Sequence, residues 1–443
     1  MNNRIKIKAL FFAGIFFAAN NIKAQDSTKQ IALQQAIDMS IKNSKNLKIS
    51  KAKIDEATAQ LQEANDSRLP DFKISGSYLR LNSANIALKT QSSQAGSSGG
   101  GSTPKINQAV YGIANLSMPL YAGGRIKYGI ESAKLLKQAT MLDAENDKDE
   151  IAFNTTKAYI NLYKSYEAVA LVKENLQSSL SRDTNFSNLE KNGLLARNDL
   201  LKSQLQTSDI ELSLLDAETN NKLAMVNMNL MIGMPENTQL VLDSSFINTK
   251  PELKNFAEYE NMALQNRKDI KAISFRKKAA VTGIKSARAL SYPTIGLTGG
   301  YIAADVPKFL TITNALNIGV GVQYNLASLY KKNTKLWEAK VRQAEVNARE
   351  EILNDEIRSE INQDYQNYQL SLKKVEVYEK AFEQATENYR ITKNKYDNSL
   401  VTITDLLEAD VSLLQSKLNI SFGKADAILA YNKLLQTSGS LSK

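Results

Sequence analysis

The chain repeats itself, which limits it to folds built from two similar halves. Asn43–Lys48 is echoed by Asn266–Lys271, and Leu69-Pro70 by Tyr292-Pro293, each 223 residues later. Further pairs lie 206 residues apart: Pro119 to Tyr121 with Asn325 to Ala327, Asn192-Gly193 with Asn398-Ser399, Asp199 to Leu201 with Asp405 to Leu407, and Gly233 with Gly439. Offsets held over such distances predict an internal duplication.

The offset falls from 223 to 206 because the first copy carries 17 extra residues between Pro70 and Pro119. A Gly/Ser-rich tract at 91–103 lies in this interval. The sequence therefore predicts an inserted flexible loop there.

The first 24 residues have the pattern of a signal peptide. Arg4, Lys6 and Lys8 precede an apolar stretch, and the order of small residues fits cleavage after Ala24, which leaves Gln25 first. The alternative is an uncleaved interfacial anchor. We expect export from the cytoplasm.

The composition argues against several functional classes. The chain has no cysteine and no histidine, so it lacks a thiol nucleophile and the commonest general base and metal ligand. Its formal charge is +10, but lysines alternate with glutamates along helical stretches such as 373–387, which is typical of a solvated helix face. We expect no cofactor, no metal, no nucleic-acid partner and no enzymatic activity.

Short segments alternate between apolar and polar residues, which is typical of strands. In the clearest, Ile318, Val320, Val322 and Leu326 share one face. The predicted strands are 71–89, 107–121, 294–305 and 312–327. One face suits lipid and the other water, although a soluble sheet packed on helices would show the same alternation. Since membrane barrels have at least about eight strands, four imply a barrel shared between chains.

The remaining sequence predicts very long helices, because 130–192, 194–232 and 322–422 contain neither glycine nor proline. Heptad-like spacing predicts coiled-coil seams at Thr155, Tyr159 and Leu162, and on the returning helix at Leu201, Leu205, Leu212 and Leu215. The predicted organisation is a signal peptide at 1–24, a first repeat at 25–233 with a helical hairpin at 125–232, a linker at 234–265, a second repeat at 266–439 with a hairpin at 329–437, and a tail at 440–443.

The order strand pair, long helix, tip turn and returning helix, duplicated behind a signal peptide, resembles the TolC-type outer-membrane efflux protein family. The most specific motifs are Leu69 to Phe72, Tyr292 to Ile295, Met118 to Gly124, and Tyr396 to Leu400 followed by Asp405 to Ala409. The resemblance implies a mainly α fold with transmembrane β-strands, in which a homotrimer shares a 12-stranded outer-membrane barrel continued by an α-helical periplasmic tunnel. The linker would form an equatorial belt, and 91–103 a cell-surface loop.

The resemblance also implies a periplasmic gate. The matching positions are Asp199, Tyr396, Asp405 and Glu408, with Tyr396 and Asp199 linking the hairpins and the two carboxylates forming a threefold ring in the lumen. Such a ring attracts cations. An aspartate near a helix start is equally a cap or a dipole partner. Val401 stands where the family pattern has an arginine, so the resemblance does not extend to a salt bridge at the gate.

The hairpin tips expose leucines at turns, and by resemblance they contact a periplasmic adaptor (membrane fusion protein). The tip residues are Asn192, Gly193, Leu194 and Leu195, with Asn398, Ser399, Leu400 and Val401. Turn chemistry alone would also place these residues there. The second copy has Ser399 at the tip position where the first copy has Gly193.

These features together predict a passive exit duct in the outer membrane of a Gram-negative bacterium, with a large periplasmic part. An inner-membrane pump of a tripartite efflux or type I secretion system would supply the energy. The alternatives are a periplasmic coiled-coil adaptor or scaffold without a barrel, and a hydrolase using a carboxylate pair such as Asp405 and Glu408.

Overall fold

The computed structural model of the protein describes residues 29–84, 106–248, 253–307 and 309–441. The predicted signal peptide, its cleavage point at Ala24 and Gln25, and the predicted loop at 91–103 lie outside these residues. The described chain is mostly helical, as predicted. None of its helices combines the length and the apolar content needed to cross a bilayer.

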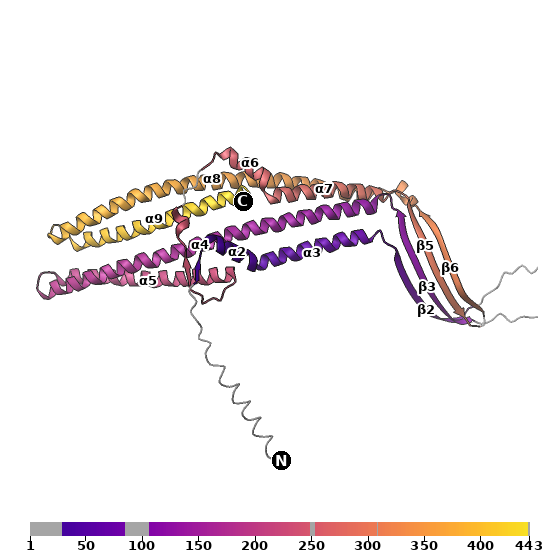
Figure 1. The fold of residues 1–443 in the computed structure, drawn as a ribbon, viewed down its shortest axis with the longest axis horizontal. Coiled ribbons are helices and arrows are strands. Elements are labelled where there is room, and N and C mark those ends of the chain that lie inside the picture. Colours follow the sequence, from indigo (N-terminus) through magenta and orange to yellow (C-terminus); the bar gives the residue numbers. More distant parts are fainter. Residues whose placement is uncertain (1–28, 85–105, 249–252, 308, 442–443) are drawn as a thin grey trace, which may run out of the picture. The chain divides into compact units, whose positions relative to one another are not determined.

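The same order of elements occurs twice along the chain (Figure 1). The first series is α2 (Leu33–Asn43), α3 (Lys45–Asp66), β2 (Asp71–Ala84), β3 (Ile106–Tyr121), α4 (Arg125–Lys191) and α5 (Arg197–Ile232). The second is α6 (Phe256–Asn266), α7 (Lys268–Ala289), β5 (Thr294–Val306), β6 (Leu310–Gln323), α8 (Thr334–Asp397) and α9 (Ile403–Thr437). Two short strands, β1 (Lys29–Ile31) and β4 (Leu240–Leu242), pair in parallel.

The chain forms two compact units. Unit 1 comprises the chain up to Ser50, Ala144–Lys268 and the chain from Asp355 onward. Unit 2 comprises Lys51–Asp143 and Asp269–Asn354. Helices α4 and α8 contribute residues to both.

Unit 2 holds an antiparallel sheet in the order β2-β3-β5-β6, whose strands lie side by side in Figure 1. Glycine is required where β3 turns into α4, because Gly123 has φ +61 and a Cβ there would lie 2.7 Å from the carbonyl oxygen of Ala289. Among the described residues, β2 and β6 each pair on one side only. Leu316 and Ile318 of β6 are 80% and 77% exposed, so its apolar face is uncovered in the single chain.

The strand predicted at 312–327 ends earlier than expected, and the following helix begins later than 329. Strand β6 stops at Gln323 because the Asn325 side chain accepts a hydrogen bond from the Ala327 amide (3.1 Å), which starts a 3₁₀ turn at Leu326–Leu329. Helix α8 begins at Thr334, where the Asn333 side chain accepts from the Leu336 amide (2.9 Å).

The predicted seam on α5 is wrong for the single chain. Leu201, Leu205, Leu212 and Leu215 are 50% to 67% exposed, whereas α5 buries the neighbouring stripe of Leu200, Ser203, Thr207 and Ile210. On α4, by contrast, Thr155, Tyr159 and Leu162 are fully buried, as the spacing predicts.

The core of unit 1 packs α4 and α5 against the β1-β4 pair. It includes Ile31, Met228 and Leu240, each fully buried. The Tyr159 hydroxyl donates to the carbonyl oxygens of Ile31 and Asp243, each at 2.9 Å. Burial raises the pKa of Tyr159 to about 12, so this hydroxyl remains a donor and fastens both strands to α4.

Candidate functional site at the helical tips

The two hairpins turn through the same backbone geometry. Gly193 and Ser399 both have left-handed φ angles, of 71° and 60°. In each turn the next amide reaches back over the helix end, from Leu194 to the Leu189 carbonyl and from Leu400 to the Lys395 carbonyl, both at 2.8 Å. This is the Schellman arrangement, which satisfies carbonyls that a helix end leaves unpaired.

Each turn exposes one of the predicted leucines, whereas Leu195 is half-buried. Leu194 is 74% exposed and Leu400 is 72% exposed. Asn192 and Asn398 hold the turns by donating from their side chains to the carbonyls of Asn188 and Asn394, both at 2.7 Å. The tips are therefore ordered turns that present an apolar side chain to solvent.

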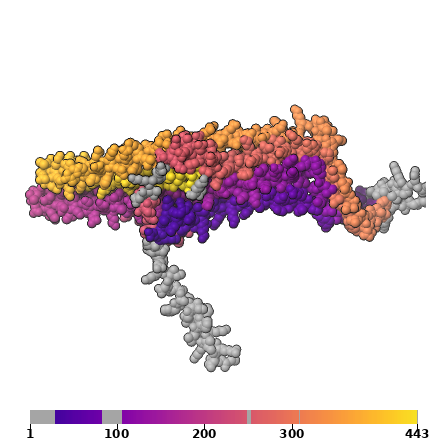
Figure 2. Space-filling model, turned by 45° about the horizontal axis from the view of Figure 1, so that its top comes forward, coloured from indigo at the N-terminus to yellow at the C-terminus, as the bar shows by residue number. Residues whose placement is uncertain are grey.

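A hydrophobic cluster lies behind the tips and joins the two hairpins within unit 1. Its buried members are Phe186, Leu200, Ile403, Leu406 and Leu407, with Leu195, Tyr389 and Tyr396 packed against them. Figure 2 shows the yellow α9 hairpin against the magenta α4 hairpin at this end of unit 1. The cluster holds Tyr396 directly, and it holds Leu406 and Leu407, which lie between Asp405 and Glu408 in the sequence.

Tyr396 and Asp199 lie close enough to interact electrostatically. The ring centroid of Tyr396 is 5.6 Å from that of Phe186. Burial raises the pKa of Tyr396, and the negative charge of Asp199 raises it further. Within the described chain the two side chains do not hydrogen-bond, and the Asp199 Oδ1 lies 3.8 Å from the Lys202 Nζ.

Asp405 caps the start of α9. Its Oδ2 accepts from the Thr402 amide (2.8 Å) and hydroxyl (2.7 Å), and its own amide donates to the Thr402 hydroxyl (3.3 Å). Donation from the Thr402 hydroxyl, and then from its amide, lowers the pKa of Asp405. The Asp405 carboxylate is exposed while it caps the helix, and the Glu408 side chain one turn later is exposed as well.

A buried ion pair that no sequence pattern indicated links the hairpins. Arg182 of α4 lies 2.9 Å from Asp410 of α9, with only 9% and 7% of the side chains exposed. The Asn175 amide (3.4 Å) also donates to Asp410, and Arg182 donates to the Ser179 hydroxyl (3.0 Å). The sequence signal that could have indicated this pair is Asp410, a charged residue one turn after Leu406 in an otherwise apolar stripe of α9.

A second polar network, which no sequence pattern indicated either, ties α4 to α5. Asp183 accepts from the hydroxyls of Ser203 and Thr207, the latter at 2.6 Å, and Ser179 lies 2.6 Å from the Thr207 hydroxyl. Hydrogen-bonded side chains thus replace leucines on the buried face of α5. Among the residues that the structure describes, no group of three acidic residues could hold a metal ion.

Comparison with known proteins gives one family and a shared fold. The family model described as outer membrane efflux protein matches residues 36–234 and 260–440. A search of curated proteins finds no match.

Solved structures with the same fold include three outer-membrane proteins. The outer-membrane channel OprN is 16% identical (TM-score 0.75, 92% of this chain, 90% of that chain). VceC from Vibrio cholerae is 19% identical (0.73, 92% and 96%). The Campylobacter jejuni outer membrane channel CmeC is 18% identical (0.74, 93% and 87%).

Proposed function

Because this chain belongs to the outer membrane efflux protein family, we propose that three copies of it assemble into an exit duct. The family places the chain in the outer membrane. The observation that carries the proposal is the open four-stranded sheet of unit 2, with its unpaired edges and an apolar face on β6.

An open sheet edge is not tolerated in lipid, since its backbone groups would lack hydrogen-bond partners. Pairing β6 of one copy with β2 of the next satisfies both edges. Two copies would supply eight strands and three copies twelve. The resemblance to TolC-type proteins favours three copies, which would share one barrel continued by a helical tunnel.

The uncovered leucine stripe on α5 supports the same assembly. Leu201, Leu205, Leu212 and Leu215 keep coiled-coil spacing yet face solvent in the single chain. A neighbouring copy packed on α5 would bury them, and burial of each leucine would stabilise the assembly by roughly 1 to 2 kcal/mol.

The duct is passive in this proposal. A periplasmic adaptor contacts the tips at Leu194 and Leu400, and an inner-membrane pump supplies the energy. We assign the chain to a tripartite efflux system because of its family, with type I secretion as the other system that uses such a duct. The signal peptide, with cleavage between Ala24 and Gln25, delivers the chain.

The gate is proposed at the tip end of the tunnel. Asp405 and Glu408 expose carboxylates on the first turns of α9, and threefold symmetry would repeat them into a ring. Tyr396 lies close enough to Asp199 to feel its charge, and we place this pair behind the ring. Val401 carries no charge, so opening does not require breaking a salt bridge at that position.

Cysteine cross-linking tests the shared barrel, because the chain has no native cysteine. One cysteine replaces Ile74 on β2 and a second is scanned along β6 through Ile318 and Val320. We expect oxidation in membranes to give covalent dimers and trimers and nothing larger.

Two outcomes contradict the proposal. Monomers alone at every position exclude pairing of these edges, and a ladder beyond trimers excludes closure at three copies. Extraction of the chain from membranes by salt without detergent would favour the periplasmic scaffold instead.

A further inference from the structure

Helix α7 carries cations that no carboxylate in the described chain neutralises. Three of its basic residues, Lys268, Arg276 and Lys277, form ion pairs with carboxylates of α4 or α8. The other four are exposed and have no ion pair among the described residues: Lys271, Lys278, Lys285 and Arg288. We call these four residues the α7 stripe.

The α7 stripe follows one face of the helix. Lys271, Lys278 and Lys285 recur every seven residues, which is close to two helical turns, and Arg288 follows one turn later. The one acidic residue of α7, Asp269, lies in the first turn and not among them. The stripe is therefore a band of a single sign of charge, roughly 25 Å long at 1.5 Å per residue.

Two ammonium groups of the α7 stripe lie over aromatic rings. The Lys278 Nζ is 5.1 Å from the centroid of the Phe275 ring, and the Lys285 Nζ is 5.9 Å from that of the Tyr128 ring. Such a contact positions a cation without cancelling its charge. The stripe thus stays positive, and the rings limit where these two ammonium groups lie.

The internal duplication shows that the helix itself does not require these cations. Helix α3 is the equivalent of α7, 223 residues earlier in the chain. Lys271 matches a lysine there, Lys48, but the last three members of the α7 stripe match Asp55, Gln62 and Asn65. The same helix of the fold therefore forms with and without the cations, so their role lies outside helix formation.

Helix α7 is an inner member of a layer of four helices in unit 2. Each strand of the sheet β2-β3-β5-β6 is continuous with one of them, in the order α3, α4, α7 and α8. Ion pairs join Arg276 to Asp143 of α4 and Lys277 to Glu350 of α8, the latter at 2.6 Å. Copies paired through β2 and β6 would meet at α3 and α8, so they would not cover α7.

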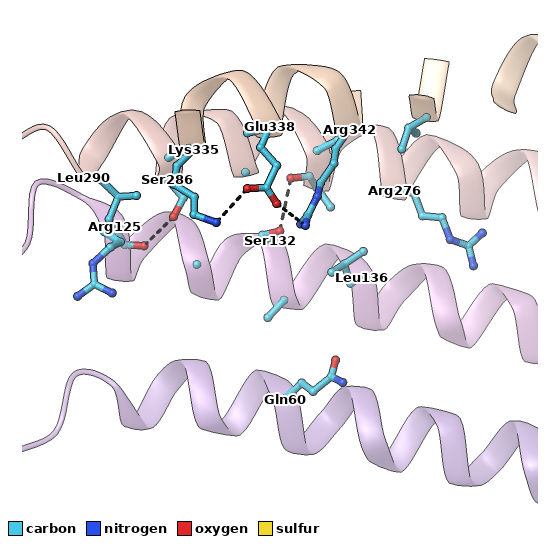
Figure 3. Close-up of a pocket in the computed structure, with 18 residues that line it drawn as sticks. Gln60, Arg125, Ser132, Leu136, Arg276, Ser286, Leu290, Lys335, Glu338 and Arg342 are labelled. Atoms are coloured by element: carbon cyan, nitrogen blue, oxygen red, sulfur yellow. Dashed lines mark hydrogen bonds and ion pairs between the residues drawn. The ribbon is translucent and has the colours of Figure 1, made fainter. Parts of the chain in front are cut away.

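The α7 stripe lies on the convex face of this layer. A cavity of about 740 Å³ is lined by residues of all four helices, from Gln60 of α3 onward, so the layer curves around it (Figure 3). Ala280 and Ala287 of α7 line the cavity. They come two residues after Lys278 and Lys285, which is about 200° around the helix. The stripe therefore faces away from the concave side.

We propose that the α7 stripe docks an acidic helix of another protein, whose carboxylates recur every seven residues and pair with the four cations. Side chains at this spacing meet along two helices that pack side by side at a small angle. Val281, which is 38% exposed between Lys278 and Lys285, offers the docked helix an apolar contact.

The direction of the α7 stripe favours a helix over a lipid surface. Helix α7 ends at Ala289 and β5 begins at Thr294, so the stripe runs along the helix away from the strands. A lipid surface around the sheet would meet only the end near Arg288, whereas a helix lying along α7 meets all four cations. This docking surface goes beyond the duct function, although its exposure between assembled copies rests on that function.

Fluorescence anisotropy with two synthetic helical peptides tests the proposal on the full chain in a neutral detergent. In the one-face peptide, glutamates recur every seven residues on one face with leucines between them. The scrambled peptide has the same composition, with its glutamates spread around the helix. The ionic strength is about 0.1 M, where the Debye length is about 10 Å and attraction between distant charges is screened.

The variants change exposed side chains only. The stripe variant combines Lys278→Asp, Lys285→Gln and Arg288→Asn, which gives α7 the residues that α3 carries. The matched control combines Lys331→Asp, Lys332→Gln and Lys340→Asn, which lowers the net charge by the same amount at exposed cations outside the stripe. Circular dichroism should show both variants folded, because α3 forms a helix with the substituted residues.

We expect the wild type to bind the one-face peptide about tenfold more tightly than the scrambled peptide. The stripe variant should lose about tenfold in affinity for the one-face peptide, because three exposed ion pairs of modest strength are removed together. The control variant should bind like the wild type.

Equal affinity for the two peptides, or equal affinity of the wild type and the stripe variant, overturns the proposal. Tighter binding of dextran sulfate than of the one-face peptide, lost in the stripe variant, would assign the stripe to an anionic polysaccharide instead. Docking and duct fail separately. A conducting trimer that does not prefer the one-face peptide overturns docking alone, and peptide binding without conductance overturns the duct alone.

Discussion

Ser399 holds a left-handed backbone conformation that Gly193 holds in the other hairpin. This conformation costs a non-glycine residue about 1 kcal/mol. We therefore predict that Ser399→Gly stabilises its tip by about 1 kcal/mol, and that Gly193→Ser destabilises the other tip by a similar amount. Hydrogen exchange at the Leu400 and Leu194 amides measures both. Changes of the same sign in the two variants would contradict the account.

The structure assigns helix capping to Asp405 and not to Glu408, which the spacing of the two carboxylates alone did not indicate. Glu408→Gln removes a charge without touching the helix cap. Asp405→Asn replaces the charged acceptor of two Thr402 donors with a neutral amide oxygen, which accepts more weakly, and so also weakens the start of α9. We predict that each variant lowers cation selectivity, and that only Asp405→Asn also lowers helix stability.

Reversal potentials in a salt gradient measure the selectivity, with Glu56→Gln on α3 as an exposed control in unit 2. Reversal potentials that stay at the wild-type value in the Glu408→Gln channel would remove the carboxylate ring from the gate.

At the scale of elements, the Arg182–Asp410 pair fastens α4 to α9. Removing one partner leaves a buried charge, so Arg182→Met should cost about 3–5 kcal/mol, and Arg182→Met with Asp410→Leu should recover most of it. Thermal unfolding measures both. The control is Glu174→Gln, which breaks an exposed pair with Lys417 between the same helices and should cost less than about 1 kcal/mol. Equal losses at both sites would show that burial is irrelevant.

Asp364 of α8 gives the contact with α9 a pH dependence. Burial raises its pKa, although the Thr437 hydroxyl donates to it at 2.6 Å and opposes the shift. Because the folded state binds this proton more tightly, Asp364 favours folding at acid pH and loses that contribution as pH rises from 3.8 through the folded pKa. The free energy of unfolding of the Asp364→Asn variant, relative to that of the wild type, should therefore increase as the pH rises from acid to neutral. A constant difference in melting temperature across that range would contradict this.

Local sequence predicted the type of each element better than its ends and contacts. The glycine- and proline-free runs marked the long helices, and alternation marked the strands. The end of β6 and the start of α8 depended on hydrogen bonds that the Asn325 and Asn333 side chains accept, which alternation does not register. The leucine spacing on α5 identified an apolar stripe but not what packs on it. The face of α5 that is buried within the chain carries Ser203 and Thr207, because their hydroxyls donate to Asp183 of α4. Arg182 and Asp410 lie 228 residues apart, so only the fold brings them together.

In the molecule as a whole, three surfaces of the single chain lack a partner. The edges of β2 and β6 lack partners, the apolar face of β6 is exposed, and the α5 leucines are uncovered. Additional copies of the chain would satisfy all three at once. The two series of elements then supply four strands per copy to one wall.

The most direct test is conductance across a planar lipid bilayer after addition of the purified, detergent-extracted protein. A trimer that forms an exit duct should produce discrete, long-lived conductance steps, with cation selectivity that falls in the Glu408→Gln variant. A purified trimer that produces no conductance steps would contradict the central claim that this chain forms an exit duct.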